Sequence, residues 1–162
     1  MDLSRRRFFS AGLSVPGNRP PWAIEEQAFI SRCTRCDECI ATCPQQLLKP
    51  GSGGFPTIQF SDAGCTLCGQ CVEACRPGAL LREEAREPFP WRALIGTDCL
   101  AQRGVECRLC GEGCEAGAIR FRPRLGGIAH PELDIDRCNG CGQCIASCPV
   151  AAITTQPKEK AA

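Results

Sequence analysis

Histidine is almost missing from this sequence of 162 residues, which has one histidine and no tyrosine. Nothing in the sequence resembles a catalytic triad, a nucleotide-binding glycine loop or a pair of substrate carboxylates. We therefore expect no catalytic residues and no enzyme with a substrate of its own. His130 stands beside Pro131 in a segment that resembles a hairpin arm, so we expect it at the surface rather than as a metal ligand.

Long hydrophobic runs and an excess of one charge are also missing. No segment approaches the roughly 18 apolar residues of a membrane span, so we expect no span. The 19 lysines and arginines nearly balance 18 aspartates and glutamates, which gives a formal net charge of +1. The basic residues are scattered or terminal and are not interleaved with aromatic residues, so nothing indicates binding of nucleic acid.

Cysteine, in contrast, is abundant: the chain has 16. The cysteines form four groups of four, which start 32, 34 and 39 residues apart. Such a regular recurrence identifies an internal repeat. In order, the groups are Cys33, Cys36, Cys39 and Cys43; Cys65, Cys68, Cys71 and Cys75; Cys99, Cys107, Cys110 and Cys114; and Cys138, Cys141, Cys144 and Cys148.

The spacing within the groups indicates 4Fe-4S clusters. In the first, second and fourth groups the gaps are two, two and three residues, whereas the first gap of the third group is seven. Three thiolates on a short loop, with Gly140 and Gly142 in the fourth group, can reach three corners of a cubane. Disulfide scaffolds have no reason to repeat this spacing, and structural zinc usually takes cysteines as separated pairs, so we rank both below iron–sulfur.

The last cysteine of each group is expected to serve a different cluster from the first three. In bacterial two-cluster ferredoxins, the fourth cysteine of this spacing binds the neighbouring cluster. We predict four clusters, or three if the third group is empty, and no cofactor-binding residues beyond their ligands. The crossed sets are Cys33, Cys36, Cys39 and Cys75; Cys65, Cys68, Cys71 and Cys43; Cys99, Cys107, Cys110 and Cys148; and Cys138, Cys141, Cys144 and Cys114.

The repeat predicts an α+β fold of two tandem bacterial-ferredoxin-like modules, in which short hairpins and short helices surround paired clusters. Hydrophobic residues make up 43% of the chain, but without the 16 cysteines they are only about a third. Modules of this size with so few apolar residues need metal for much of their folding free energy. The predicted parts are a basic arm 1–21, a module 22–85, a linker 86–94, a module 95–157 and a tail 158–162.

Local patterns place a few elements within these modules. Helical spacing of apolar residues predicts a short helix within 22–32. Alternation predicts an edge strand over 57–60, in a hairpin between the first two groups. A second alternating strand is expected over 118–123, with residues 128–135 returning to the fourth group.

The N-terminus contains Ser4-Arg5-Arg6-Arg7-Phe8-Phe9, which looks like a twin-arginine export motif. The apolar stretch that should follow is interrupted by Ser10, Gly12 and Ser14, and then meets prolines. We therefore expect a flexible basic arm on a cytoplasmic protein. Export by the twin-arginine route, which carries folded cofactor proteins, is the second interpretation.

The segments between the cysteines carry a specific resemblance over nearly the whole chain. These segments include Arg19-Pro20-Pro21-Trp22, Cys33-Thr34-Arg35-Cys36-Asp37, Gly53-Gly54-Phe55-Pro56, Val105-Glu106-Cys107-Arg108, Phe121-Arg122-Pro123 and Cys138-Asn139-Gly140-Cys141-Gly142. With these, the sequence resembles the NapF family, the ferredoxin-type accessory proteins of periplasmic nitrate reductase systems. The resemblance implies a soluble cytoplasmic protein that binds the precursor of the molybdenum-containing catalytic subunit before export.

Two classes of function stay open. The first, which the resemblance implies, is an assembly factor that assists maturation of the catalytic subunit by delivering electrons or cluster components. The second is a general multi-cluster ferredoxin or an electron-transfer subunit of a redox enzyme. Both classes need the same cysteines, so the spacing does not separate them.

Overall fold

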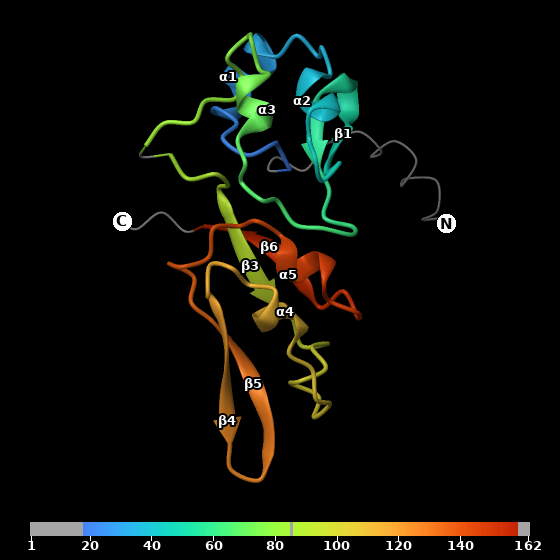
Figure 1. Ribbon diagram of the computed structural model, residues 1–162, viewed down its shortest axis with the longest axis vertical. Coiled ribbons are helices and arrows are strands. Elements are labelled where there is room, and N and C mark those ends of the chain that lie inside the picture. The colour runs from blue at the N-terminus through green and yellow to red at the C-terminus, as the bar shows by residue number, and fades with distance from the viewer. Residues whose placement is uncertain (1–17, 85, 159–162) are drawn as a thin grey trace, which may run out of the picture. The chain divides into compact units, whose positions relative to one another are not determined.

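The computed structural model describes residues 18–84 and 86–158 (Figure 1). Residues 1–17, with the twin-arginine-like motif, and residues 159–162 of the predicted tail lie outside the described part. The chain forms two compact units. The first unit runs to Gln59 and includes Gln70–Leu81, whereas the second contains Phe60–Gly69 and the chain from Arg82 onward. These bounds differ from the predicted modules, which placed residues 60–69 in the first module.

The first unit contains three short helices, a 3-10 turn and one hairpin. Its elements are α1 (Glu26–Arg32), α2 (Glu38–Ala41), β1 (Leu48–Pro50), η1 (Ser52–Gly54), β2 (Pro56–Ile58) and α3 (Gln70–Glu73). β1 and β2 pair antiparallel from Leu48 opposite Ile58 to Pro50 opposite Pro56. The predicted hairpin is confirmed, but its second strand begins and ends earlier than the expected 57–60.

The predicted helix within 22–32 starts only at Glu26. The carboxylate of Glu25 accepts hydrogen bonds from the backbone N–H groups of Gln27 and Ala28, which caps the helix there. Before the cap, Ala23 forms an antiparallel bridge with Leu80. This bridge joins the beginning of the first unit to the segment that follows its last cysteine.

The core of the first unit is aromatic and aliphatic. Phe29 is fully buried, and Trp22, Leu48 and Leu80 are each at most 5% exposed. Arg19 lies over the ring of Phe29, with its guanidinium carbon 4.7 Å from the ring centroid, and forms an ion pair with Glu26. The N-terminal segment of this unit is therefore fastened to α1 by packing and by charge.

The second unit has two two-stranded antiparallel sheets. Its elements are β3 (Trp91–Ile95), α4 (Leu109–Glu112), β4 (Ile119–Arg124), β5 (Gly127–Leu133), α5 (Gln143–Ala146) and β6 (Ile153–Pro157). β3 pairs with β6, and β4 pairs with β5 in the long hairpin of Figure 1. The strand predicted over 118–123 corresponds to β4, and β5 lies in the segment that was expected to return to the fourth group.

β3 begins at Trp91, within the stretch 86–94 that the sequence suggested as a linker. Trp91 and Ala93 alternate along the strand, and both are buried. Pairing with β6 satisfies the backbone from Trp91 opposite Pro157 to Ile95 opposite Ile153. The strand therefore belongs to the core of the second unit, and its partner lies too far along the chain for a local pattern to reveal it.

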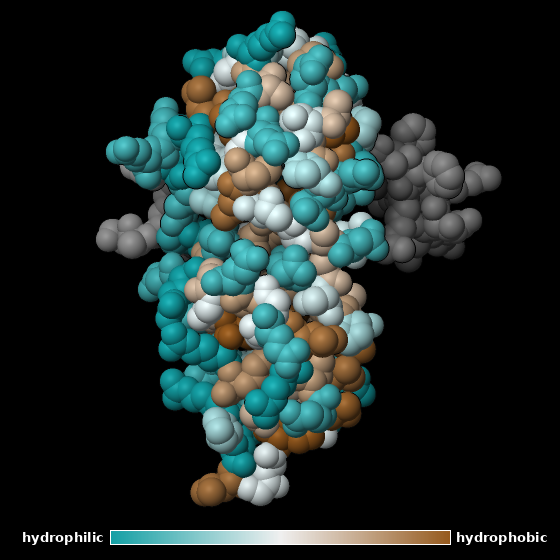
Figure 2. Space-filling model, viewed as in Figure 1, coloured by the Kyte–Doolittle hydropathy of each residue, from teal (hydrophilic) through white to brown (hydrophobic). Residues whose placement is uncertain are grey.

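Cysteines form part of the second unit's core. One buried cluster consists of Ala93, Cys110, Ile119, Cys144 and Ile153. Figure 2 shows polar residues over much of one face of the molecule, with apolar residues scattered among them. No helix within residues 18–84 and 86–158 is long and apolar enough to cross a membrane.

Candidate metal centres

A cavity in the first unit brings together cysteines from two groups. The first three cysteines of the first group line it, and so does Cys75, the last cysteine of the second group. Cys33 ends α1, Cys39 lies in α2, and Cys75 follows α3. These are the four cysteines of the first crossed set.

The loop between α1 and α2 bends tightly around this cavity. Arg35 and Asp37 have φ angles of +57° and +60°, which non-glycine residues seldom adopt. Arg35 also lies over the ring of Phe55, 5.3 Å from its centroid. The loop is thus held in a strained conformation that turns Cys33, Cys36 and Cys39 toward one space.

The thiols of this cavity interact electrostatically. The pKa of Cys39 is raised to about 11, mainly by burial and also by the neighbouring Cys75, Cys33 and Cys36. Thiolates are the metal-binding form of cysteine, and without a cation several of them in one half-buried place repel one another. The site therefore has the chemistry of a thiolate site that a bound cationic metal group would stabilise.

A second cavity lies in the second unit. Cys138, Cys141 and Cys144 of the fourth group line it together with Cys114, the last cysteine of the third group. The pKa of Cys144 is raised to about 12, mainly by burial and also by Cys141, Cys138, Cys110 and Cys114. The fourth crossed set is thus brought together in one apolar cavity.

Gly140 and Gly142 let the loop of the fourth group approach its neighbours closely, as the sequence predicts. Both have positive φ, +76° and +77°. A Cβ on Gly140 would lie 2.8 Å from the carbonyl oxygen of Trp91, and one on Gly142 would lie 2.4 Å from the ring of Phe60. The indole N–H of Trp91 donates to the carbonyl of Gly140 at 3.1 Å. Any side chain at these two positions would displace the loop.

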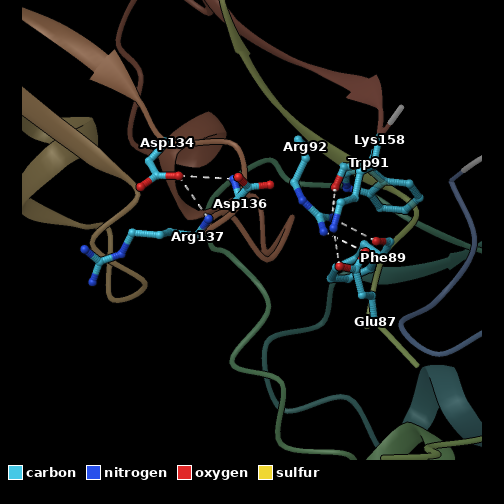
Figure 3. A network of polar contacts seen from close by, with 8 residues as sticks. All are labelled: Glu87, Phe89, Trp91, Arg92, Asp134, Asp136, Arg137 and Lys158. Carbon is cyan, nitrogen blue, oxygen red and sulfur yellow. Dashed lines mark hydrogen bonds and ion pairs between the residues drawn. The ribbon is translucent and has the colours of Figure 1, made fainter. Parts of the chain in front are cut away.

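Asp134 stabilises the turn that precedes the first cysteine of the fourth group. Its carboxylate accepts from the backbone N–H groups of Asp136 and Arg137, at 3.2 and 3.4 Å, in the manner of an Asx turn (Figure 3). The N–H of Cys138 donates to the backbone carbonyl of Asp134 at 3.2 Å. The sequence analysis missed this residue, although an aspartate two and three residues before the contacted amides is a recognisable turn signal.

The third group clusters around Cys110 despite its long first gap. The pKa of Cys110 is raised to about 11, mainly by burial and also by the nearby Cys99 and Cys107. Cys148, the fourth member of the predicted set, packs against the buried cluster that contains Cys110 and Cys144. The inserted residues form turns, since the N–H of Val105 donates to the carbonyl of Leu100 at 2.9 Å.

The second group is divided between the two units. Cys65 and Cys68 lie in Phe60–Gly69 of the second unit, whereas Cys71 lies in α3 of the first unit. Cys43, the predicted partner from the first group, also belongs to the first unit. The backbone N–H of Leu67 lies 3.4 Å from the sulfur of Cys65, and Cys71 is buried. The second group thus contributes Cys65 and Cys68 to the second unit and Cys71 and Cys75 to the first.

The two cavities fit a group larger than one ion. Within the described ranges, no three or more histidine, cysteine, aspartate or glutamate side chains are arranged to hold a single metal ion. A 4Fe-4S cluster takes its thiolates at separate irons, and each cavity offers four cysteines with apolar neighbours. His130 lines neither cavity; it is half-buried in β5, 3.4 Å from the guanidinium of Arg124.

Arg92 forms a polar network that the sequence analysis also missed (Figure 3). Its side chain is almost fully buried, donates to the carbonyls of Phe89 and Trp91, and pairs with Glu87 at 2.6 Å. Lys158 pairs with the same glutamate, and the hydrogen bond from Lys158, with a second from Arg92, lowers the pKa of Glu87. No local pattern distinguishes this arginine from the exposed charges around it.

Comparison with known protein families first identifies the class of domain. The 4Fe-4S dicluster domain matches residues 32–79 and 104–152, that is, twice in the chain. The first match includes all eight cysteines of the first two groups, and the second leaves out Cys99. The structure's short helices and two-stranded sheets agree with small α+β domains of this class.

The particular family follows from full-length relatives. The ferredoxin-type protein NapF of Escherichia coli is 43% identical over 158 residues, which cover 96% of each chain. NapF of Haemophilus influenzae is 44% identical over 94% of this chain and 93% of its own. The methylamine utilization ferredoxin-type protein MauM of Methylobacillus flagellatus is 33% identical over 87% of this chain and 68% of its own. The chain belongs to the NapF family of ferredoxin-type proteins.

Proposed function

We propose that the chain is an iron–sulfur accessory protein that carries four 4Fe-4S clusters on the four crossed cysteine sets. One observation carries the proposal most directly. Cys75 lines the cavity of the first group and Cys114 lines that of the fourth group, so each comes from the group adjacent in sequence. This exchange is what crossed ligation requires of a two-cluster module.

A 4Fe-4S cluster supplies one-electron transfer when it is bound. The protein's own residues would hold its irons and set its surroundings. Trp91, Ile119 and Leu133 line the second cavity and give it an apolar wall. The N–H of Ala152 donates to the sulfur of Cys148 at 3.3 Å, and such hydrogen bonds stabilise negative charge on a ligand sulfur.

We propose that the partner is the precursor of the molybdenum-containing catalytic subunit of a periplasmic nitrate reductase. The resemblance to the NapF family supports this, and so does the lack of any recognisable substrate site in the sequence. The chain would bind the precursor in the cytoplasm before export and assist its maturation, with electron delivery and cluster delivery as the two forms of assistance.

Capture of the precursor tests this function. The cluster-loaded protein, prepared anaerobically, is immobilised and offered the catalytic subunit either with or without its export signal. We expect retention of the form that carries the signal. Equal retention of both forms, or of neither, would contradict the assembly role. Protein with the exposed substitution Gln102→Met serves as a matched control for handling of the clusters.

A general electron carrier is the second candidate, and the likeness to MauM favours it. A relative named for methylamine utilization matches most of this chain, so a similar cysteine framework occurs in a protein named for a different process. This alternative predicts steady reduction of several unrelated acceptors by the reduced protein. It also predicts no preference for the precursor over the mature catalytic subunit.

A further inference from the structure

The loop Phe60–Gly69, here called the strap, belongs to the second unit, although the residues on both sides of it belong to the first. It carries Cys65 and Cys68 and contains no helix or strand. The backbone N–H of Cys65 donates to the carbonyl of Cys141 at 2.8 Å. The N–H of Gly64 donates to the side-chain oxygen of Gln143 at 2.9 Å. The strap is therefore fastened to the loop of the fourth group.

The contact is too close for side chains at two positions. A Cβ on Gly64 would lie 2.6 Å from the backbone of Gln143, and Gly142 meets the ring of Phe60 in the same way. Phe60 also meets Phe89 edge to face, with centroids 6.2 Å apart. Two hydrogen bonds and the close approaches at two glycines together make a fitted surface between the strap and the fourth group.

We propose that Gln143 is a positioning residue for the second group: by holding the strap, it presents Cys65 and Cys68 for cluster binding. The strap lacks regular secondary structure, so contacts with its surroundings must order the two thiols. Gln143 lies between Cys141 and Cys144, where it is fixed by the fourth group itself. Loading of the second group therefore depends on an intact fourth group. This inference rests on the proposed cluster binding.

The acceptor on Gln143 gives a discriminating pair of substitutions. Gln143→Met keeps the length of the side chain and removes the acceptor, whereas Gln143→Glu keeps an oxygen that accepts from Gly64. Iron and sulfide are measured on anaerobically purified full-length protein, and alkylation of each cysteine is mapped by mass spectrometry. We expect Gln143→Met to lose about four irons and to expose Cys65 and Cys68 to alkylation. Gln143→Glu should keep the iron content and the protection of both cysteines.

A second substitution tests the same contact from the strap. Gly64→Ala should expose Cys65 and Cys68 in the same way. The matched control is Gly127→Ala, where the nearest atom to a new Cβ is 3.9 Å away. In both loss variants Cys138, Cys141 and Cys144 should stay protected from alkylation.

The outcomes distinguish a failure of cluster binding from a failure of the positioning role of Gln143. Wild-type protein that binds no iron and sulfide would refute the cluster proposal itself. Fully loaded wild-type protein with Gln143→Met also fully loaded would overturn the positioning role. Equal loss from all four groups in Gln143→Met, or no rescue by Gln143→Glu, would reduce Gln143 to a structural residue and would overturn it as well.

Discussion

The two units surround similar cavities with different kinds of core. In the first unit the buried residues are mainly large, such as Trp22, Phe29 and Leu80, and they include one cysteine. In the second unit Phe89 and Trp91 are also buried, but most of the other buried residues are alanine or cysteine. We therefore expect the second unit to depend more on bound clusters for folding than the first does.

Removal of the metal should have the largest effect on this comparison. We predict that metal-free protein is largely unfolded, because the apolar core is small and the cysteine loops need clusters to hold their shape. Circular dichroism measures the loss, and hydrogen exchange should show the second unit less protected than the first. A native-like fold that melts cooperatively without iron would contradict the prediction.

Crossed ligation predicts that a single substitution in one group empties a site built by another. Cys75→Ser should lower the iron content by about four and expose Cys33, Cys36 and Cys39 to alkylation. Cys43→Ser is the matched control, since it should leave these three cysteines protected. A structure of the loaded protein with Cys43 bound alongside Cys33, Cys36 and Cys39 would disprove the crossing.

Within the second unit, the third group is expected to hold its cluster less tightly than the fourth group. We predict about sixteen irons per chain, with the cluster on Cys99, Cys107 and Cys110 the most labile, because ordering the inserted residues costs roughly 1 to 2 kcal/mol each before packing offsets it. Cys99→Ser should remove about four irons and leave the first unit loaded. A stable protein with twelve irons, unaffected by Cys99→Ser, would show that the third group holds no cluster.

The smallest expected effect concerns the network around Arg92. Glu87→Gln removes the charge that pairs with Arg92 and Lys158, and should destabilise the second unit by about 1 kcal/mol, since Glu87 is about half exposed. The pKa of Glu87 is lowered from 4.5, so this stabilisation is present above that pH and is lost as the pH falls. Anaerobic urea unfolding at neutral pH measures the change, and an unchanged midpoint would contradict it.

The grouping of the cysteines could be predicted because short, repeated gaps between cysteines are typical of iron–sulfur proteins. The sets of Cys75 and of Cys114 follow from gaps of two and three residues and from the repeat, and the hairpin of β4 and β5 follows from local alternation. The strap, the pairing of β3 with β6 and the burial of Arg92 depend instead on packing between distant segments. For this reason the sequence assigned residues 60–69 to the first module and residues 91–94 to a linker.

The pairing of β3 with β6 has a consequence for synthesis on the ribosome. Ile95 and Ile153 face each other across this sheet, 58 residues apart in the chain. At 5 to 20 residues per second, about 3 to 12 seconds pass between the emergence of one and that of the other. The bridge between Ala23 and Leu80 closes the first unit long before this. The third group, and near the end of the interval the fourth, emerge in an unfinished domain, so we expect iron and sulfide to be delivered to these cysteines only after Ile153 has emerged.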